Sequence, residues 1–145
     1  MNIVERLKEQ LLDKILKFDE KSARRIYIDL KPEDIYDAVK FIFKDLGCRF
    51  ATASGVDTPA GIEMLYHFSY DETGQIISFR ALITDKIKPE IKSIAPLFKG
   101  AEWIERETWE LLGVNFIGHP NLKHLLLIDE WPEGSFPLHH DRKLS

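Results

Sequence analysis

The chain has 145 residues, a length that suits one globular domain with a substantial buried core. Its 44% hydrophobic and 30% charged residues are ordinary for a folded protein and exclude disorder as its main state. A formal net charge of −4 argues against a nucleic-acid-binding protein, which presents a basic surface to phosphates.

Cysteine content and hydropathy further narrow the class of protein to which the chain can belong. Cys48 is the only cysteine, so the chain can form no internal disulfide and cannot supply the thiolates of an iron–sulfur cluster. The opening segment MNIVERLKEQ carries charge throughout and lacks the apolar core of a secretory signal. The apolar run LLLI at 125–128 is far shorter than the ~18 residues of a membrane-spanning helix. We therefore expect an intracellular protein that meets a membrane only through partners.

The first part of the chain predicts a helix, a strand and a second helix. Asn2 is placed to cap a helix with a regular apolar stripe, which we expect to end near Lys17. Residues 24–30 alternate in polarity, as a half-buried strand does. Pro32 suits the first turn of the next helix, and Gly47 suits its end.

The middle of the chain predicts three strands. Residues 48–54 form the first, and the glycines, proline and aspartate of residues 55–61 predict a loop after it. Residues 62–70 and 75–84 alternate clearly in polarity, and the DETG sequence at 71–74 between them is typical of a hairpin turn.

The last predicted element is a helix from Ala101 to Leu112, which follows a short irregular piece after Pro89 and stops at Gly113. Five side chains share the arc that we expect to face the sheet: Ala101, Ile104, Thr108, Leu111 and Leu112.

This order of elements predicts a two-layer α+β domain over residues 1–112, with a small, mostly antiparallel sheet and helices on one face. A doubly wound parallel sheet is not expected, because only one strand-to-strand connection contains a helix. Residues 113–145 contain glycines and prolines that interrupt regular structure, yet they are too apolar to remain in water. We expect them to form an extended C-terminal arm that packs on the domain and on partner subunits.

Two tryptophans fall outside the expected inward arc of the last helix. Trp103 and Trp109 lie among charged residues, and large rings flanked by charge are typical of a protein contact surface. An equally weighted alternative is that the C-terminal segment folds back over these rings. Glu105 and Glu107 point to different sides of the helix, so they cannot act together on one substrate atom as acid and base.

The most distinctive pattern in the chain is AEWIERETWELLGVNFIGHPNLKHLLLI at 101–128. The residues that carry it are, in order, Glu105, Arg106, Glu107, Glu110, Leu111, Leu112, His119, Lys123, Leu125 and Leu126. This pattern closely resembles the segment that marks the 30 kDa-type (C) subunit of the NADH:quinone oxidoreductase family, which also serves membrane-bound, energy-converting hydrogenases. The FPLHHDR segment at 136–142 resembles the family's PLRKD-type ending, with His139 and His140 in place of the usual basic pair.

The resemblance implies a cofactor-free structural subunit in the peripheral arm of a membrane-bound oxidoreductase. The complex would be a complex I-like NADH:quinone dehydrogenase or an energy-converting [NiFe] hydrogenase, with this chain on the cytoplasmic face of the cell membrane. The implied partners are a hydrogenase-large-subunit-like (49 kDa-type) subunit and iron–sulfur subunits, which this chain would position for electron transfer coupled to ion translocation. Fe–S clusters, and Ni–Fe in a hydrogenase, would belong to those partners.

The expected partner interface combines the last helix, the turn after it and the arm. Its residues are Trp103, Glu105, Arg106, Glu107, Trp109, Glu110, Phe116, His119, Pro120, Lys123, Trp131, Pro137 and Asp141. No catalytic, cofactor-binding or metal-binding residue is expected, and no activity is expected of the chain alone.

Histidines near the C-terminus leave open the alternative of a free-standing, small metal-dependent enzyme; a weaker alternative is an assembly factor that binds the same partner only transiently. Positions 119, 124, 139 and 140 hold four of the five histidines. Against a metal site, HExxH spacing is absent and the lone cysteine excludes the common zinc-finger patterns. His119-Pro120 after Gly118 is typical of a structural turn.

Overall fold

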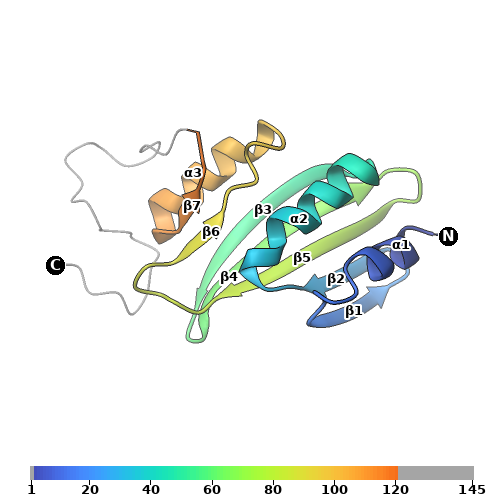
Figure 1. The fold of residues 1–145 in the computed structure, drawn as a ribbon, viewed down its shortest axis with the longest axis horizontal. Helices are drawn as coiled ribbons and strands as arrows, with labels where there is room; N and C mark the ends of the chain where they lie inside the picture. Colours follow the sequence, from blue (N-terminus) through green and yellow to red (C-terminus); the bar gives the residue numbers. More distant parts are fainter. Residues whose placement is uncertain (1, 121–145) are drawn as a thin grey trace. The chain divides into compact units, whose positions relative to one another are not determined.

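The computed structural model describes residues 2–120, which form two β-sheets together with helices (Figure 1). In chain order the elements are α1 (Ile3–Gln10), β1 (Lys17–Ser22), β2 (Arg25–Asp29), the 3-10 helix η1 (Pro32–Asp34), α2 (Ile35–Lys40), the π-helical η2 (Phe41–Asp45), β3 (Arg49–Thr58), β4 (Gly61–Tyr70), β5 (Gln75–Ile83), β6 (Glu90–Lys92), α3 (Gly100–Leu112) and β7 (Asn115–Ile117). Within the described residues, no helix combines the length and the apolar character that a membrane crossing needs.

The larger sheet has the strand order β1-β2-β5-β4-β3. β1 pairs antiparallel with β2, whereas β2 pairs parallel with β5, with Ile28 opposite Phe79. β3, β4 and β5 follow one another through turns of two and four residues, lengths that join antiparallel neighbours as hairpins. The sheet is mixed but mostly antiparallel, so the predicted α+β class is confirmed.

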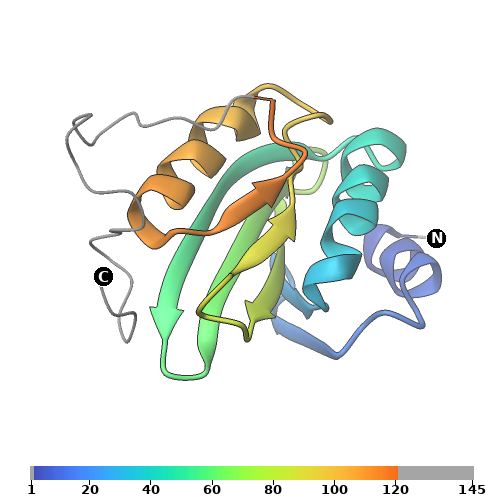
Figure 2. The same ribbon diagram turned by 60° about the vertical axis from the view of Figure 1, so that its left-hand side comes forward.

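The chain divides into two compact units, and β3, β4 and β5 contribute residues to both. The first unit is Met1–Thr52 with Leu65–Ala81. In it, α1 and α2 lie over one face of the sheet (Figures 1 and 2). Leu7 of α1 and Val39 of α2 are buried, as is Phe68 of β4. The Asn2 side chain accepts a hydrogen bond from the Glu5 amide at 2.8 Å, which confirms the predicted cap of α1.

The second unit is Ala53–Met64 with Leu82–Ser145. Its described part contains β6, α3 and β7, in which the helix connects two short parallel strands, as parallel pairing requires. Ile91 of β6 lies opposite Phe116 of β7, and both side chains are buried. Gly113 ends α3 with a φ of 77°, the left-handed conformation that glycine adopts without strain, as the sequence predicts.

The helix predicted to reach Lys17 is too long. α1 ends at Gln10, and residues 17–22 form β1 instead. Fully buried side chains of the stripe end at Leu11, and residues 17–22 pair antiparallel with β2, so strand pairing takes the place of the last predicted turns of the helix.

The strands differ from the sequence prediction in two further places. The loop expected at 55–61 is mostly strand, because β3 runs to Thr58 and only residues 59–60 form the turn. β6 and β7 are not predicted by the sequence, since three-residue strands are too short to show alternation. β7, which follows the predicted domain boundary at residue 112, pairs with β6, and that boundary stays a prediction. Most of the predicted arm, 121–145, lies outside the described residues.

Candidate functional site

The outer side of α3 presents an aromatic ring to solvent. Trp103 is 57% exposed, which is unusual for so large an apolar side chain. The guanidinium carbon of Arg106 lies 6.0 Å from the centre of the Trp103 ring, a cation–π distance. The Nε atom of Arg106 is buried and has no hydrogen-bond acceptor among the described residues. The Trp103 ring, with Arg106 beside it, offers a partner an exposed aromatic surface.

The inner side of α3 carries a buried carboxylate. Glu105 is 2% exposed and accepts two hydrogen bonds, from the Ser93 hydroxyl to Oε1 at 2.5 Å and from the Ile94 amide to Oε2 at 2.9 Å. Ser93 itself accepts a hydrogen bond from the Ala95 amide at 3.0 Å. Burial raises the pKa of Glu105 to about 7, although the hydrogen bonds from Ser93, Ile94 and Ala95 oppose the rise.

His119 lies beside this carboxylate. Its Nε2 atom is 4.0 Å from Oε1 of Glu105 and 2.9 Å from the backbone carbonyl oxygen of Glu102. A carbonyl only accepts, so Nε2 carries the hydrogen and donates it. The side chain is fully buried, although the residue as a whole is partly exposed through its backbone. β6 and β7 run side by side next to α3 (Figures 1 and 2). Glu105 thus lies between Ser93, which donates to it, and His119, 4.0 Å away.

The predicted inward face of α3 is partly wrong. Ala101, Thr108 and Leu112 are buried as expected, but Ile104 and Leu111 are only half-buried. Glu105 and Glu110 are buried in addition, although both were expected on the outer, charged side. The signal is present in the spacing, because Glu105 is four residues after Ala101 and three before Thr108, on the same stripe.

The residues of the predicted interface therefore separate into groups. The exposed members are Trp103, Glu107 and Pro120. The half-buried members are Arg106, Trp109 and His119. The members buried within the chain are Glu105, Glu110 and Phe116, so they cannot touch a partner directly in this conformation. The members outside the described residues are Lys123, Trp131, Pro137 and Asp141.

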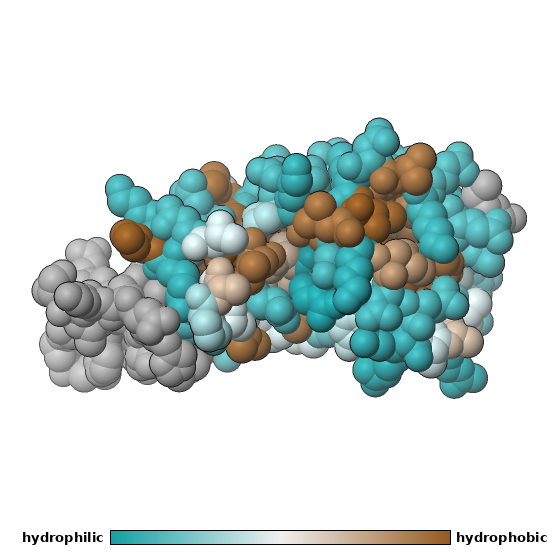
Figure 3. All heavy atoms as spheres, turned by 90° about the horizontal axis from the view of Figure 1, so that it is seen from below, coloured by the Kyte–Doolittle hydropathy of each residue, from teal (hydrophilic) through white to brown (hydrophobic). Residues whose placement is uncertain are grey.

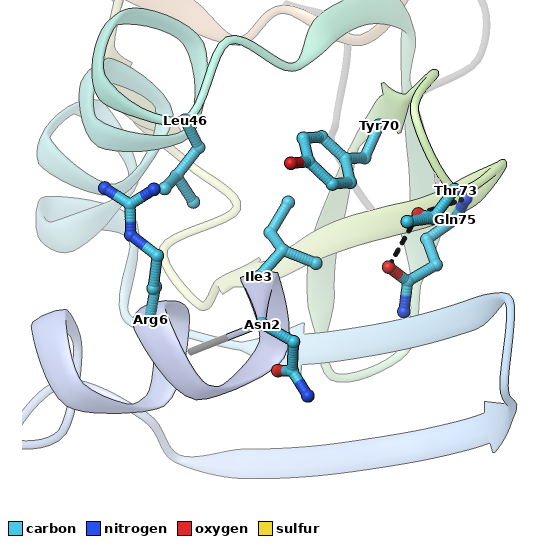
Figure 4. Close-up of a pocket in the computed structure, with 7 residues that line it drawn as sticks. All are labelled: Asn2, Ile3, Arg6, Leu46, Tyr70, Thr73 and Gln75. Atoms are coloured by element: carbon cyan, nitrogen blue, oxygen red, sulfur yellow. Dashed lines mark hydrogen bonds between the residues drawn. The ribbon is translucent and has the colours of Figure 1, made fainter.

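The first unit contains a hollow of about 180 Å³ beside the start of α1 (Figure 4). Ile3 and Leu46 give it an apolar wall, and Arg6 and Tyr70 contribute polar atoms. Its hydroxyl groups are engaged locally, since the Thr73 hydroxyl donates to the Gln75 side chain at 2.8 Å and the Tyr70 hydroxyl donates to Glu72 at 2.5 Å. The hollow lacks the nucleophile–base pair that an enzyme site needs.

Exposed apolar side chains are scattered over the described surface. The face drawn in Figure 3 is largely hydrophilic, with hydrophobic patches set among polar residues. Within residues 2–120, no group of three or more His, Cys, Asp or Glu side chains is arranged to hold a metal ion. His124, His139 and His140 lie outside the described residues, so the metal-enzyme alternative stays a prediction there.

Comparisons with known proteins give a consistent result. The family model described as respiratory-chain NADH dehydrogenase, 30 Kd subunit, matches residues 28–145. The NADH-quinone oxidoreductase C subunit of Rhodobacter capsulatus is 39% identical over 106 residues, which cover 68% of this chain and 52% of that protein. The C subunit of Chelativorans sp. is 35% identical over 130 residues, covering 86% and 62%. The C/D subunit of Bacteroides thetaiotaomicron is 32% identical over 98 residues, covering 66% and 18%. The chain thus spans about half the length of the first of these relatives.

Two solved structures share the fold. A trypsin-resistant fragment of Nqo5 superposes with a TM-score of 0.67 at 21% identity, covering 82% of this chain and 98% of the fragment. A chain in the membrane-bound sulfane sulfur reductase, an archaeal respiratory membrane complex, gives a TM-score of 0.80 at 22% identity, covering 98% and 84%. At these identities the likeness shows the fold alone.

Proposed function

Because this chain belongs to the family of respiratory-chain NADH dehydrogenase 30 kDa subunits, we propose that it is a structural subunit of a membrane-bound respiratory complex. Its place is the cytoplasmic peripheral arm, which it joins through other subunits. The complex is a complex I-like NADH:quinone oxidoreductase or a related energy-converting [NiFe] hydrogenase. The relatives named as C subunits of NADH-quinone oxidoreductase support the first of these.

The proposed mechanism is positional. The chain fixes the orientation of its neighbours so that their redox centres stay within electron-transfer range, while ions are translocated elsewhere in the complex. The state of Cys48 supports a role without a bound cluster. Its side chain is 1% exposed, and burial raises the pKa of the thiol to about 12, which disfavours the thiolate that a metal cluster needs.

The proposed partners are the hydrogenase-large-subunit-like (49 kDa-type) subunit and an iron–sulfur subunit, which hold the Fe–S clusters and any Ni–Fe centre. The Bacteroides relative supports a large neighbour, because its C/D name assigns two subunits to one chain and the matching part is 18% of it. Sequencing the large subunit that co-purifies with this chain separates the two kinds of complex. A nickel-binding CxxC pair in it favours the hydrogenase.

The exposed Trp103 beside Arg106 is the observation that carries the proposed contact. A large ring on a helix surface loses little side-chain entropy when a partner covers it, and tryptophan and arginine dominate the binding energy of protein interfaces. Trp109 is a poorer probe, because it is half-buried and its truncation would also remove contacts within the chain.

Trp103→Ala tests this proposal. We expect the variant chain to fold normally, because most of the ring is in solvent. We expect its affinity for the rest of the complex to fall by about 30-fold or more, since interface tryptophans contribute about 2 kcal/mol or more. The measurement is the yield of partner subunits that co-purify with the tagged chain, together with the turnover of the purified complex. Arg106→Glu is expected to act in the same direction.

Leu12→Ala is the matched control, because Leu12 is also a large apolar side chain in solvent but lies in the first unit. It should leave assembly and turnover unchanged. Full assembly and full turnover with both Trp103→Ala and Arg106→Glu would contradict the proposal that α3 is the contact surface.

A further inference from the structure

A groove of about 240 Å³ lies between β3 and α3 in the second unit. One wall is formed by residues 53–55 of β3, and the other by side chains in the C-terminal half of α3, from Glu107 to Leu112. Glu107 lies one helical turn after Trp103, and side chains four residues apart share one face of a helix. The groove therefore continues the α3 surface that we propose as the contact with a partner.

The floor of the groove is apolar. Gly55 has no side chain, and a Cβ atom added there would lie 3.0 Å from the Cγ2 methyl group of Thr108. The Thr108 hydroxyl donates to the carbonyl oxygen of Ile104 at 3.0 Å, so its methyl group is the part that faces β3. Leu111 and Leu112 complete the floor from α3. Leu111 is only half-buried, so part of its aliphatic side chain is left for another molecule to cover.

The rim of the groove carries one negative charge. Glu107 is exposed, and it is the only charged residue that lines the groove. Among the described residues, no lysine, arginine or histidine forms an ion pair with it. Ser54, on the wall formed by β3, is exposed and uncharged. The groove is therefore complementary to an aliphatic side chain that has a cation beside it.

The size of the groove suits one side chain better than a cofactor. Small-molecule sites are usually about 300–1,000 Å³ and place several convergent polar groups around the ligand. This groove is smaller, and its polar side chains are Ser54 and Glu107 at the rim and Thr108, whose hydroxyl is bonded to the helix backbone. An aliphatic residue of another polypeptide is the occupant that this size and charge favour.

We propose that the groove receives one aliphatic side chain of a partner subunit, and that a lysine or arginine next to that side chain in the partner pairs with Glu107. This inference rests on the proposed role of α3 as a contact surface, and it adds what the partner presents there. The aliphatic group covers Leu111 and Leu112. The cation lies at the rim, where an ion pair that is partly shielded from water is stronger than one in solvent.

Site-specific photo-crosslinking in the assembled complex tests the occupant. Ser54 is replaced by p-benzoylphenylalanine, because it lines the groove and is exposed, so the fold should tolerate the larger side chain. We expect a crosslink to a partner subunit, at a peptide in which an aliphatic residue lies within about four positions of a lysine or arginine. The same crosslinker at Leu12, in the first unit, is the control and should not give this product. A crosslink to residues 121–145 of this chain, or no crosslink to another subunit, would overturn the proposal.

Charge variants test the ion pair. Glu107→Lys should lower the affinity of the chain for its partner by about 10-fold or more, because the substitution replaces attraction by repulsion. Glu90→Lys is the matched control, since Glu90 is an exposed carboxylate on β6 in the same unit and its substitution changes the net charge equally. It should lower the affinity by less than about 3-fold. Replacing the cation at the crosslinked site by glutamate should restore the affinity of Glu107→Lys, and the absence of that rescue contradicts the pairing.

The combined results distinguish a failure of this inference from a failure of the proposed function. If Trp103→Ala weakens assembly but Glu107→Lys acts no more strongly than Glu90→Lys, α3 remains a contact surface and the inference is wrong. If only Glu107→Lys weakens assembly, the groove is supported and the contact at Trp103 is contradicted. If neither Trp103→Ala nor Glu107→Lys weakens assembly, both the proposed contact and the inference are contradicted.

Discussion

At the scale of single residues, Glu105 is the least expected feature of the chain. A buried carboxylate costs several kcal/mol unless hydrogen bonds replace its water. Ser93 and Ile94 supply two such bonds, but desolvation still raises the pKa of Glu105 to about 7. The protonation of Glu105 therefore moves from acidic pH to near neutral pH.

The free energy of unfolding should depend on pH through this residue. The pKa of Glu105 is raised in the folded chain from its ordinary value of 4.5 to about 7, so folding is favoured when the group is protonated. That contribution is complete below about pH 4.5 and is lost as the pH rises through about 7, a change of about 3 kcal/mol at about 1.4 kcal/mol per pH unit. Urea unfolding of the wild-type chain at several pH values measures it.

Glu105→Gln should abolish this dependence, because glutamine does not titrate, while Glu90→Gln should retain it. If the free energy of unfolding of Glu105→Gln falls with pH as steeply as that of the wild type, another group is responsible.

At the scale of elements, a glycine in β3 allows α3 to pack closely against that strand. A Cβ atom added at Gly55 would lie 2.9 Å from Cδ1 of Leu112 and 3.0 Å from Cγ2 of Thr108, closer than carbon atoms normally approach. The backbone of β3 thus approaches the helix more closely than any other residue would allow. The position of α3, the helix that carries Trp103, depends on this contact.

Gly55→Ala should destabilise the chain by about 1–3 kcal/mol, because the extra methyl group forces Leu112 and Thr108 to move. Gly100→Ala is the control, since a Cβ atom there meets nothing within 4 Å. At the start of α3 it should be neutral or stabilising by up to about 1 kcal/mol. Thermal unfolding followed by circular dichroism compares them. Equal changes in stability from the two substitutions would contradict close packing at Gly55.

The predictable elements are those whose own sequence carries a strong local signal. The β4–β5 hairpin is predictable because the alternation on both sides of DETG is clear, and α3 because Gly113 ends a regular stripe. β1 is not predictable from its own sequence, because apolar residues continue at helical spacing after Leu11. The strand conformation of residues 17–22 depends on their pairing with β2. The extension of β3 through Gly55 is not predictable either, because a glycine in this sequence indicates a loop. Its role in the strand becomes clear only from the side chains of α3 that pack against it.

Predictability of the site divides in the same way. Exposure of Trp103 follows from its position outside the apolar stripe, and the structure confirms it. The burial of Glu105 depends on donors supplied by Ser93 and Ile94, which belong to another segment and follow a strand too short to predict. A charged residue on the apolar stripe is the local sign of such a site.

At the scale of the whole molecule, the described residues of α3 and the turn after β7 that belong to the predicted interface lie in one of the two units. Trp103, Arg106, Glu105 and His119 all belong to the second unit, whose described part is built around β6, α3 and β7. The family match spans residues 28–145 and so includes this unit and much of the first. The proposed contact helix therefore lies in the part of the chain that the family match covers completely.

The positional role predicts a full chain whose stability does not depend on a metal ion. An ion present at about 1,000 times its dissociation constant would add about 4 kcal/mol to the free energy of unfolding. Its removal would then lower the melting temperature by about 10 °C in a chain of this size. We expect EDTA to leave the melting temperature unchanged and elemental analysis to find less than one ion per chain. A stoichiometric ion and a large fall in melting temperature, both lost in a variant with His139→Ala and His140→Ala, would instead favour the metal-dependent enzyme.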